Sequence, residues 1–139
     1  MTVGVVLTGV LIGAYIAVSV RSAAWCKFYA GFAVRDYLST HPVRKLQIGA
    51  GGQDMPGWLN SDIAPGRNET HLDAAARFPF PEGSIHFIYA EQVIEHLDYQ
   101  DGLGMLRECH RVLAPGGKVR IATPDLLKTG WTVSGGQDG

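Results

Sequence analysis

The chain has 139 residues, enough for one domain and too few for two full domains. Its 46% hydrophobic residues and formal net charge of −1 exclude a disordered chain and a strongly basic nucleic-acid binder. Two cysteines, Cys26 and Cys109, are too few for a disulfide scaffold, and their spacing does not predict a metal site.

The N-terminus is apolar: residues 1–20 carry no charged side chain, and residues 3–20 are an uninterrupted apolar run. As a helix this run would extend roughly 27 Å at about 1.5 Å per residue, close to the roughly 30 Å core of a bilayer. We therefore expect residues 1–21 to form a hydrophobic helix that anchors the protein in a membrane. Arg21 and Lys27 follow the run and nothing basic precedes it, which predicts a cytoplasmic domain after it. A cleaved signal peptide and a buried helix of a cytoplasmic protein are the alternatives.

Residues 22–42 follow as a bridging segment with a partial helical stripe of Trp25, Phe28, Tyr29, Phe32 and Val34. We expect a helix that packs on the domain or lies at the membrane interface. Proline disfavours the helical conformation of the residue before it, so residues 41–42 should end this helix.

A short apolar strand is predicted over residues 45–48, and it runs directly into clustered glycines at 49–52. Such glycines let a ligand approach backbone N–H groups closely, although a plain tight turn has the same pattern. A second strand is predicted at residues 58–63. The interval leaves no room for a full crossover helix, so the first connection should be a loop or a single turn. A nicotinamide dinucleotide site is therefore disfavoured, because its fingerprint requires a helix there.

Aspartates end the second and third predicted strands. Asp62 ends the strand at 58–63 beside the glycine loop, where a carboxylate can accept both hydrogen bonds of a ribose diol or can cap the following turn. Asp73 ends a short strand at residues 70–73, where it can accept from an exocyclic amine or cap the turn at residues 74–76.

A buried central strand is predicted at residues 85–90, with Glu91 and Gln92 at its carboxyl end, the edge where parallel sheets bind ligands. A helix should follow at residues 103–113, with Arg111 on its solvated side. Its apolar face should be centred near Leu103, Leu106, His110 and Leu113, with Met105, Cys109 and Val112 flanking it. Proline and glycines at 115–117 end that helix, and a fifth strand is predicted at residues 118–123.

Four segments in this order resemble class I S-adenosylmethionine-dependent methyltransferases of the small-molecule type. They are LQIGAGG at residues 46–52, GWLNSDI at 57–63, VIEHL at 93–97 and RVLAPGG at 111–117. The resemblance covers residues 44–125. It implies an α/β, Rossmann-like fold with a mostly parallel five-stranded sheet over residues 43–126. The chain ends before the last two strands that the family adds, so we expect a C-terminally short fold with a flexible tail at 127–139.

The resemblance also implies S-adenosyl-L-methionine as the cofactor, with roles assigned by position and no metal. Gly49, Ala50 and Gly51 would lie under its methionine part, Asp62 would hold the ribose hydroxyls, and Asp73 would face the adenine.

Further along the chain, Glu91 and Gln92 would border the sulfonium and the substrate. The family usually has an acidic residue where Gln47 stands, and this departure weakens the expected contact with the cofactor amine. His96 is the candidate catalytic base, with capping of the next helix as its alternative role.

Methyl transfer to an unidentified small-molecule or lipid acceptor is the function that the resemblance implies, and nothing in the sequence indicates nucleic-acid binding. The alternative is a truncated, catalytically silent cofactor-binding or structural module at a membrane. The reason for this alternative is that the chain ends soon after the fifth strand, which would leave that strand as an exposed edge of the sheet.

Overall fold

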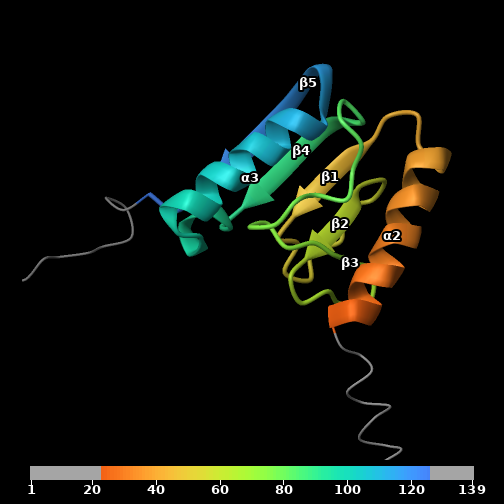
Figure 1. The fold of residues 1–139 in the computed structure, drawn as a ribbon, viewed down its shortest axis with the longest axis horizontal. Coiled ribbons are helices and arrows are strands. Elements are labelled where there is room, and N and C mark those ends of the chain that lie inside the picture. The colour runs from red at the N-terminus through yellow and green to blue at the C-terminus, as the bar shows by residue number, and fades with distance from the viewer. Residues whose placement is uncertain (1–22, 126–139) are drawn as a thin grey trace, which may run out of the picture.

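The computed structural model describes residues 23–125, and for residues 23–28 it describes the backbone alone. Within that range the chain forms five strands, two helices and one short 3-10 helix (Figure 1). The elements in order are α2 (Ala23–Thr40), β1 (Lys45–Ile48), β2 (Leu59–Asp62), β3 (Thr70–His71), β4 (Ile85–Glu91), η1 (Ile94–His96), α3 (Tyr99–Val112) and β5 (Leu113–Ala122).

The five strands form one parallel sheet in the order β3-β2-β1-β4-β5. The chain runs outward from β1 to β3 on one side and from β4 to β5 on the other, so the strand order reverses between β1 and β4. This confirms the predicted Rossmann-like sheet. The connection from β1 to β2 contains no helix, as the short interval between them predicted. Parallel strands joined in this way place their ligand site at the reversal, outside the carboxyl ends.

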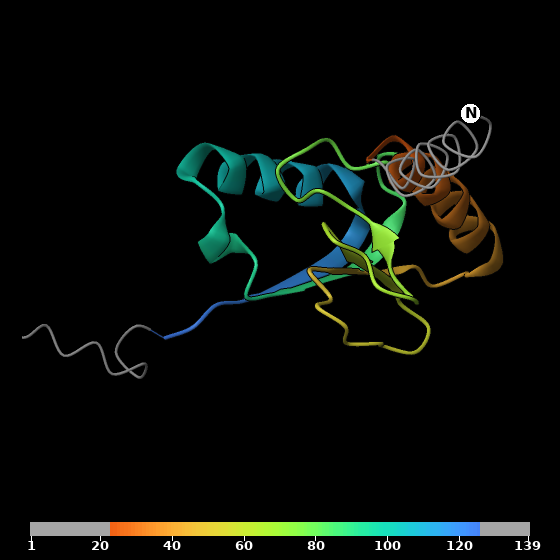
Figure 2. The same ribbon diagram turned by 90° about the horizontal axis from the view of Figure 1, so that it is seen from below.

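Both helices stand on the same side of the sheet, whereas the loop between β1 and β2 lies on the other side (Figure 2). Val34 of α2 and Met105 and Val112 of α3 belong to one buried cluster with Leu46 and Ile88 of the strands. The two helices therefore share a single core. In addition, the Tyr37 hydroxyl donates to the carbonyl oxygens of residues 45 and 57, which fixes the end of α2 against the sheet.

The predicted apolar stripe of α2 is confirmed at Val34 and wrong at two of its aromatic residues. Tyr29 and Phe32 are 61% and 58% exposed, whereas Ala30 and Tyr37 are buried together with Val34. These buried residues also follow helical spacing, so periodicity alone allowed two faces. Packing against β3 decided which face is buried.

The predicted helix is present, but it begins at Tyr99 rather than at residue 103, and it buries the flank of the predicted face rather than its centre. Its buried residues are Gly102, Met105, Cys109 and Val112, whereas Leu106 is 41% exposed. Asp98 provides the N-cap, because its side chain accepts a hydrogen bond from the N–H of residue 101.

Arg111 is not solvated as predicted, because it clamps the loop between β3 and β4 onto α3. Its guanidinium donates to the carbonyl oxygens of Phe78 and Phe80 and to the carboxylate of Glu108. Glu108 in turn accepts from the N–H of Phe78. These hydrogen bonds hold the proline-rich loop against α3. They also satisfy backbone groups of the loop that have no partner in a neighbouring strand.

Strand β4 is buried on one face only, which corrects the prediction of a buried central strand. Ile88 and Ala90 are buried on the helix side, whereas Phe87 on the opposite face is 38% exposed. The cause is the placement of both described helices on one side of the sheet (Figure 2).

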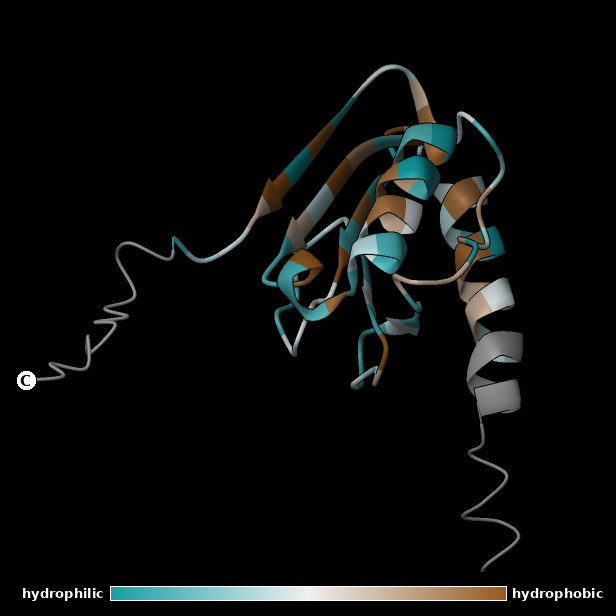
Figure 3. Ribbon diagram, turned by 60° about the vertical axis from the view of Figure 1, so that its left-hand side comes forward, coloured by the Kyte–Doolittle hydropathy of each residue, from teal (hydrophilic) through white to brown (hydrophobic). Residues whose placement is uncertain are grey.

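Strand β5 starts at residue 113, earlier than the predicted residue 118, and is interrupted near its start. Leu113 pairs with Ile85 and Lys118 pairs with Phe87, so residues 114–117 form a bulge opposite a single residue of β4. Beyond the bulge, hydrophobic and hydrophilic residues alternate along the strand (Figure 3). The proline and glycines that end the helix therefore form this bulge.

The predicted N-terminal anchor at residues 1–21 and the predicted tail at 127–139 lie outside the described residues. Between residues 23 and 125, no helix is both long and apolar enough to cross a membrane.

Candidate functional site

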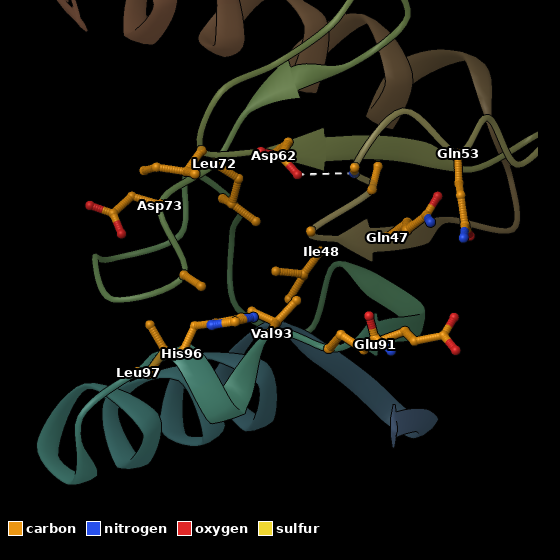
Figure 4. Close-up of a pocket in the computed structure, with 16 residues that line it drawn as sticks. Gln47, Ile48, Gln53, Asp62, Leu72, Asp73, Glu91, Val93, His96 and Leu97 are labelled. Carbon is orange, nitrogen blue, oxygen red and sulfur yellow. Dashed lines mark hydrogen bonds between the residues drawn. The ribbon is translucent and has the colours of Figure 1, made fainter. Parts of the chain in front are cut away.

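A cavity of about 650 Å³ opens at the carboxyl ends of β1, β2 and β4 (Figure 4). This volume suits a small organic ligand. The cavity is lined by Gln47, Ile48, Gly49, Ala50, Gly51, Gln53, Asp62, Ile63, Leu72, Asp73, Ala74, Glu91, Gln92, Val93, His96 and Leu97. All eight of the residues predicted as site residues are in this set. The cavity also has an apolar wall formed by Ile48, Leu72, Val93 and Leu97, which were not among the predicted site residues.

The glycine loop brings backbone into the cavity at positions where a side chain is excluded or strained. Gly49, Gly51 and Gly52 all have positive φ, at 68°, 54° and 87°. A Cβ atom on Gly49 would collide with Cγ2 of Val93, whereas one on Gly51 would meet nothing within 4 Å. Gly49 is therefore required by packing, and Gly51 leaves the cavity open.

Two N–H groups of this loop, those of Gly51 and Gly52, already donate hydrogen bonds to carboxylates. Asp62 accepts from the N–H of Gly51 at 3.0 Å (dashed line in Figure 4), and its second oxygen accepts from the N–H of Ala64 at 2.9 Å. Glu69 accepts from the N–H of Gly52 at 2.7 Å and from that of Gly66 at 2.6 Å. Sequence reasoning missed Glu69, because a glutamate in a surface loop carries no signal of its partner.

The charge of the cavity is one-sided. Its lining includes the carboxylates of Asp62, Asp73 and Glu91, and no lysine or arginine of the part of the chain that the structure describes is in it. A phosphate group entering along the glycine loop would find the N–H groups of Gly51 and Gly52 taken and would meet carboxylates instead. The cavity therefore favours a cationic ligand and disfavours a phosphorylated one.

Gln47 has an unsatisfied acceptor next to this cavity. The residue is 2% exposed. Among the buried side-chain nitrogen and oxygen atoms of residues 23–125, its Oε1 alone has no hydrogen-bond partner. An unpaired buried acceptor costs free energy unless a ligand donates to it. A ligand with an N–H or ammonium group would complete this hydrogen bond.

The end of β4 contributes a strained backbone conformation at Gln92 and a hydrogen bond between Tyr89 and Glu91. Gln92 has a φ of 53°, the left-handed region that non-glycine residues seldom adopt, and its N–H donates to the carbonyl oxygen of residue 122. Glu91 accepts a hydrogen bond from the Tyr89 hydroxyl at 2.6 Å, and this contact raises the pKa of Tyr89 above its usual value. Strain of this kind is characteristic of functional sites.

His96 and Asp73 lie toward one end of the cavity, and Gln47, Gln53 and Glu91 lie toward the other (Figure 4). Asp73 accepts from the N–H of Ala75, so it caps the following turn as well as lining the cavity. His96 is exposed, and the alternative of helix capping is wrong for it, since Asp98 caps α3. No side chain within residues 23–125 orients the His96 ring by a hydrogen bond.

Comparison with known proteins identifies the family of the domain. Residues 47–121, just over half of the chain, match the family model described as a methyltransferase domain. A Mycolicibacterium smegmatis protein named as a probable S-adenosylmethionine-dependent methyltransferase is 40% identical over 63 residues, which are 45% of this chain and 22% of that protein. The chain therefore spans about a fifth of the length of this curated relative.

Two solved structures are similar to this chain at low TM-scores and low identity. The trans-methyltransferase CalH in complex with SAH has a TM-score of 0.44 and 19% identity, over 76% of this chain and 41% of that one. A chain from the complex of the Haloferax volcanii Trm112 methyltransferase activator with a methyltransferase has a TM-score of 0.42 and 16% identity, over 77% and 57%. The family assignment rests on the sequence match over residues 47–121, and by that match the chain belongs to the family of methyltransferase domains.

Proposed function

We propose that this chain binds S-adenosylmethionine and supports transfer of its methyl group to an acceptor. The observation that carries the proposal is the charge of the cavity, because three carboxylates line it and, among the described residues, no lysine or arginine does. In addition, the N–H groups of Gly51 and Gly52 already donate to carboxylates, so they are not available to bind a phosphate. S-adenosylmethionine is a cation without phosphate. Nicotinamide dinucleotides and ATP are phosphorylated anions, so the same cavity disfavours them.

The residues present fit the parts of this cofactor. The unpaired Oε1 of Gln47 would accept from the ammonium group, and the open space over Gly51 would admit the methionine chain. Asp62 keeps free lone pairs on both carboxylate oxygens after its two backbone contacts, so it would still accept from the ribose hydroxyls. Asp73, capping its turn through one oxygen, would face the adenine, and Leu72 beside it would supply apolar contact.

S-adenosylmethionine, when bound, supplies a methyl group that its sulfonium already activates. The chain's contribution is alignment and exclusion of water, for which the Val93 and Leu97 side chains and the fixed backbone at Gln92 are suited. An anionic acceptor would need no base. For an acceptor that must lose a proton, we propose His96 as the base, provided that the acceptor enters from its end of the cavity.

The acceptor that we propose is a small molecule or lipid. The support is the net charge of −1, which gives no general attraction for a polyanion such as a nucleic acid.

Calorimetry on the full chain tests this function. We expect S-adenosylmethionine and S-adenosylhomocysteine to bind and NAD and ATP not to bind. The affinity for the cationic S-adenosylmethionine should fall as salt rises, and that for the net-neutral S-adenosylhomocysteine should fall less, because salt screens charge. The variant Asp62→Ala should weaken both by about tenfold. Glu95→Ala, at an exposed position outside the cavity, serves as the control. A folded sample that binds neither compound, or one that binds ATP equally well, would contradict the proposal.

A further inference from the structure

A second groove lies on the face of the sheet that the described helices leave uncovered. It has a volume of about 650 Å³ and is lined by Gln53, Met55, Trp58, Phe87, Ile88, Tyr89, Lys118, Val119 and Arg120. Only Gln53 belongs to both this groove and the cavity described above. The groove is therefore a separate site that borders the cavity.

Aromatic rings form much of the groove. Trp58 and Tyr89 meet edge to face, with ring centroids 6.5 Å apart, and Phe87 on the same strand as Tyr89 is 38% exposed. The two residues of β4 are separated by one position, so their side chains point to the same face of the sheet. Three aromatic side chains next to one another on an open face can stack against a planar ligand.

Cations surround these rings. The Lys45 ammonium lies 5.7 Å from the centroid of the Trp58 ring, and the Arg120 guanidinium lies 5.9 Å from that of Tyr89. Lys118 pairs with Phe87 in the sheet register, so it stands on the same face and is exposed.

The groove and the cavity therefore have opposite charge. The lining of the groove includes Lys118 and Arg120 and no acidic residue, whereas three carboxylates line the cavity. A cationic ligand in the groove would be repelled by the positive charges of Lys45, Lys118 and Arg120.

We propose that this groove binds a small planar aromatic anion, such as an aryl carboxylate. Its ring would stack on Tyr89 and Phe87, and its carboxylate would pair with the Arg120 guanidinium, which binds such groups through two parallel hydrogen bonds. A small ligand fits better than a nucleic acid, since the groove has the volume of a single small-ligand site and the chain carries a net charge of −1.

This inference goes beyond the proposed function and does not require it. The two sites are adjacent, however. Gln53 lines both, and the Tyr89 hydroxyl in the groove donates to Glu91 at the rim of the cavity. An aromatic anion held in the groove would thus lie beside the cationic ligand proposed for the cavity.

Calorimetry on the full chain without S-adenosylmethionine tests the groove by itself, so failure here is distinct from failure of cofactor binding. The probe is naphthalene-2-carboxylate. Naphthalene-2-methanol has the same rings without the charge, and cyclohexanecarboxylate has the charge without the aromatic ring. We expect the probe to bind about tenfold tighter than either comparison compound, because stacking and ion pairing act together.

Substitutions locate the binding. Arg120→Gln and Lys118→Gln, both at exposed positions, should each weaken the probe about fivefold without unfolding the chain. Tyr89→Leu should weaken binding of the probe to a similar extent, whereas Tyr89→Phe should bind the probe as wild type does, because the aromatic ring remains. Arg107→Gln on the exposed side of α3 is the matched control. Equal binding of the three compounds, or full binding by Arg120→Gln and Tyr89→Leu, would overturn the proposal. So would tighter binding of a single-stranded oligothymidylate, which would assign the groove to nucleic acid.

Discussion

The carboxylate of Asp62 accepts a hydrogen bond from the N–H of Gly51 at 3.0 Å, so the end of β2 holds the loop that follows β1. Its other oxygen accepts from the N–H of Ala64 at 2.9 Å. Both interpretations of Asp62 from the sequence are thus compatible: it caps a turn, and it stands in the cavity with lone pairs left for a ligand.

We predict that Asp62→Ala lowers the free energy of unfolding by about 1–3 kcal/mol, since two N–H groups lose a charged acceptor. Asp62→Asn, which keeps one acceptor oxygen, should lose about half as much. Urea denaturation at neutral pH measures both. Wild-type stability of Asp62→Ala would mean that water replaces the carboxylate at Gly51 without loss.

Gly49 and Gly51 are a matched pair for the glycine loop. Both have positive φ, but only at Gly49 would a Cβ atom collide with a neighbour, Val93. We expect Gly51→Ala to lower stability by about 1–2 kcal/mol, the cost of the left-handed conformation. Gly49→Ala should cost about 2–5 kcal/mol, because overpacking is added. Removing the Val93 side chain in the double variant Gly49→Ala/Val93→Ala should recover part of that loss. Equal losses at the two glycines would show that the collision is relieved by small shifts.

Gln47 should show opposite effects on stability and on binding. Gln47→Leu removes a buried acceptor without a partner, so we expect unchanged or slightly higher stability in denaturation without ligand. The same variant should bind S-adenosylmethionine about tenfold more weakly. Gln47→Glu places a charge at this buried position, so it should destabilise the free protein and tighten S-adenosylmethionine binding. Parallel changes in stability and affinity for both variants would contradict a direct contact.

The Glu108–Arg111 pair predicts a pH dependence of stability. The hydrogen bond from Arg111 holds the pKa of Glu108 at about 2, against its ordinary 4.5. A lowered pKa in the folded state gives stability that is fully present above about pH 4.5 and is lost as pH falls toward 2. We expect Glu108→Gln to be on the order of 1–3 kcal/mol less stable than wild type at pH 7, with the difference shrinking below pH 4.5. Urea denaturation between pH 7 and pH 3 checks this, with Glu95→Gln as the exposed control. A difference that stays constant with pH would exclude the charged pair as its cause.

The apolar run at residues 3–20 remains a prediction of a membrane anchor, with the domain on the cytoplasmic side. The support is its length and lack of charge, with Arg21 following it. After cell fractionation, the full chain should stay in the membrane pellet through carbonate extraction, and a chain without residues 2–21 should not. Recovery of the full chain in the supernatant would refute the anchor.

The sequence alone determined the order of the strands and, to within two residues, their carboxyl ends. Apolar runs bounded by glycine and proline set β1, β2 and β4 to within a residue or two, and parallel strands bring their carboxyl ends together. Because of that rule, the amino-acid pattern by itself places residues as far apart as Gly49, Asp62 and Glu91 at one edge of the sheet. The resemblance to a methyltransferase family added the ligand, and the family match over residues 47–121 agrees with it.

Tertiary structure decided which faces are buried and which groups are partners. On α2 more than one stripe follows helical spacing, and only packing against the strands buried Ala30 and Tyr37 and left Phe32 exposed. On α3 the same packing left Leu106 exposed and buried Met105, which the pattern placed only at the flank of the apolar face. Glu69 accepts a hydrogen bond from the N–H of Gly52, and Arg111 donates to the carbonyl oxygens of residues 78 and 80. These contacts join residues far apart in the chain, so no local sequence pattern predicts them. The groove beside Tyr89 has the same origin. It exists because both described helices cover one side of the sheet, a choice made by the shared core and not by any one segment.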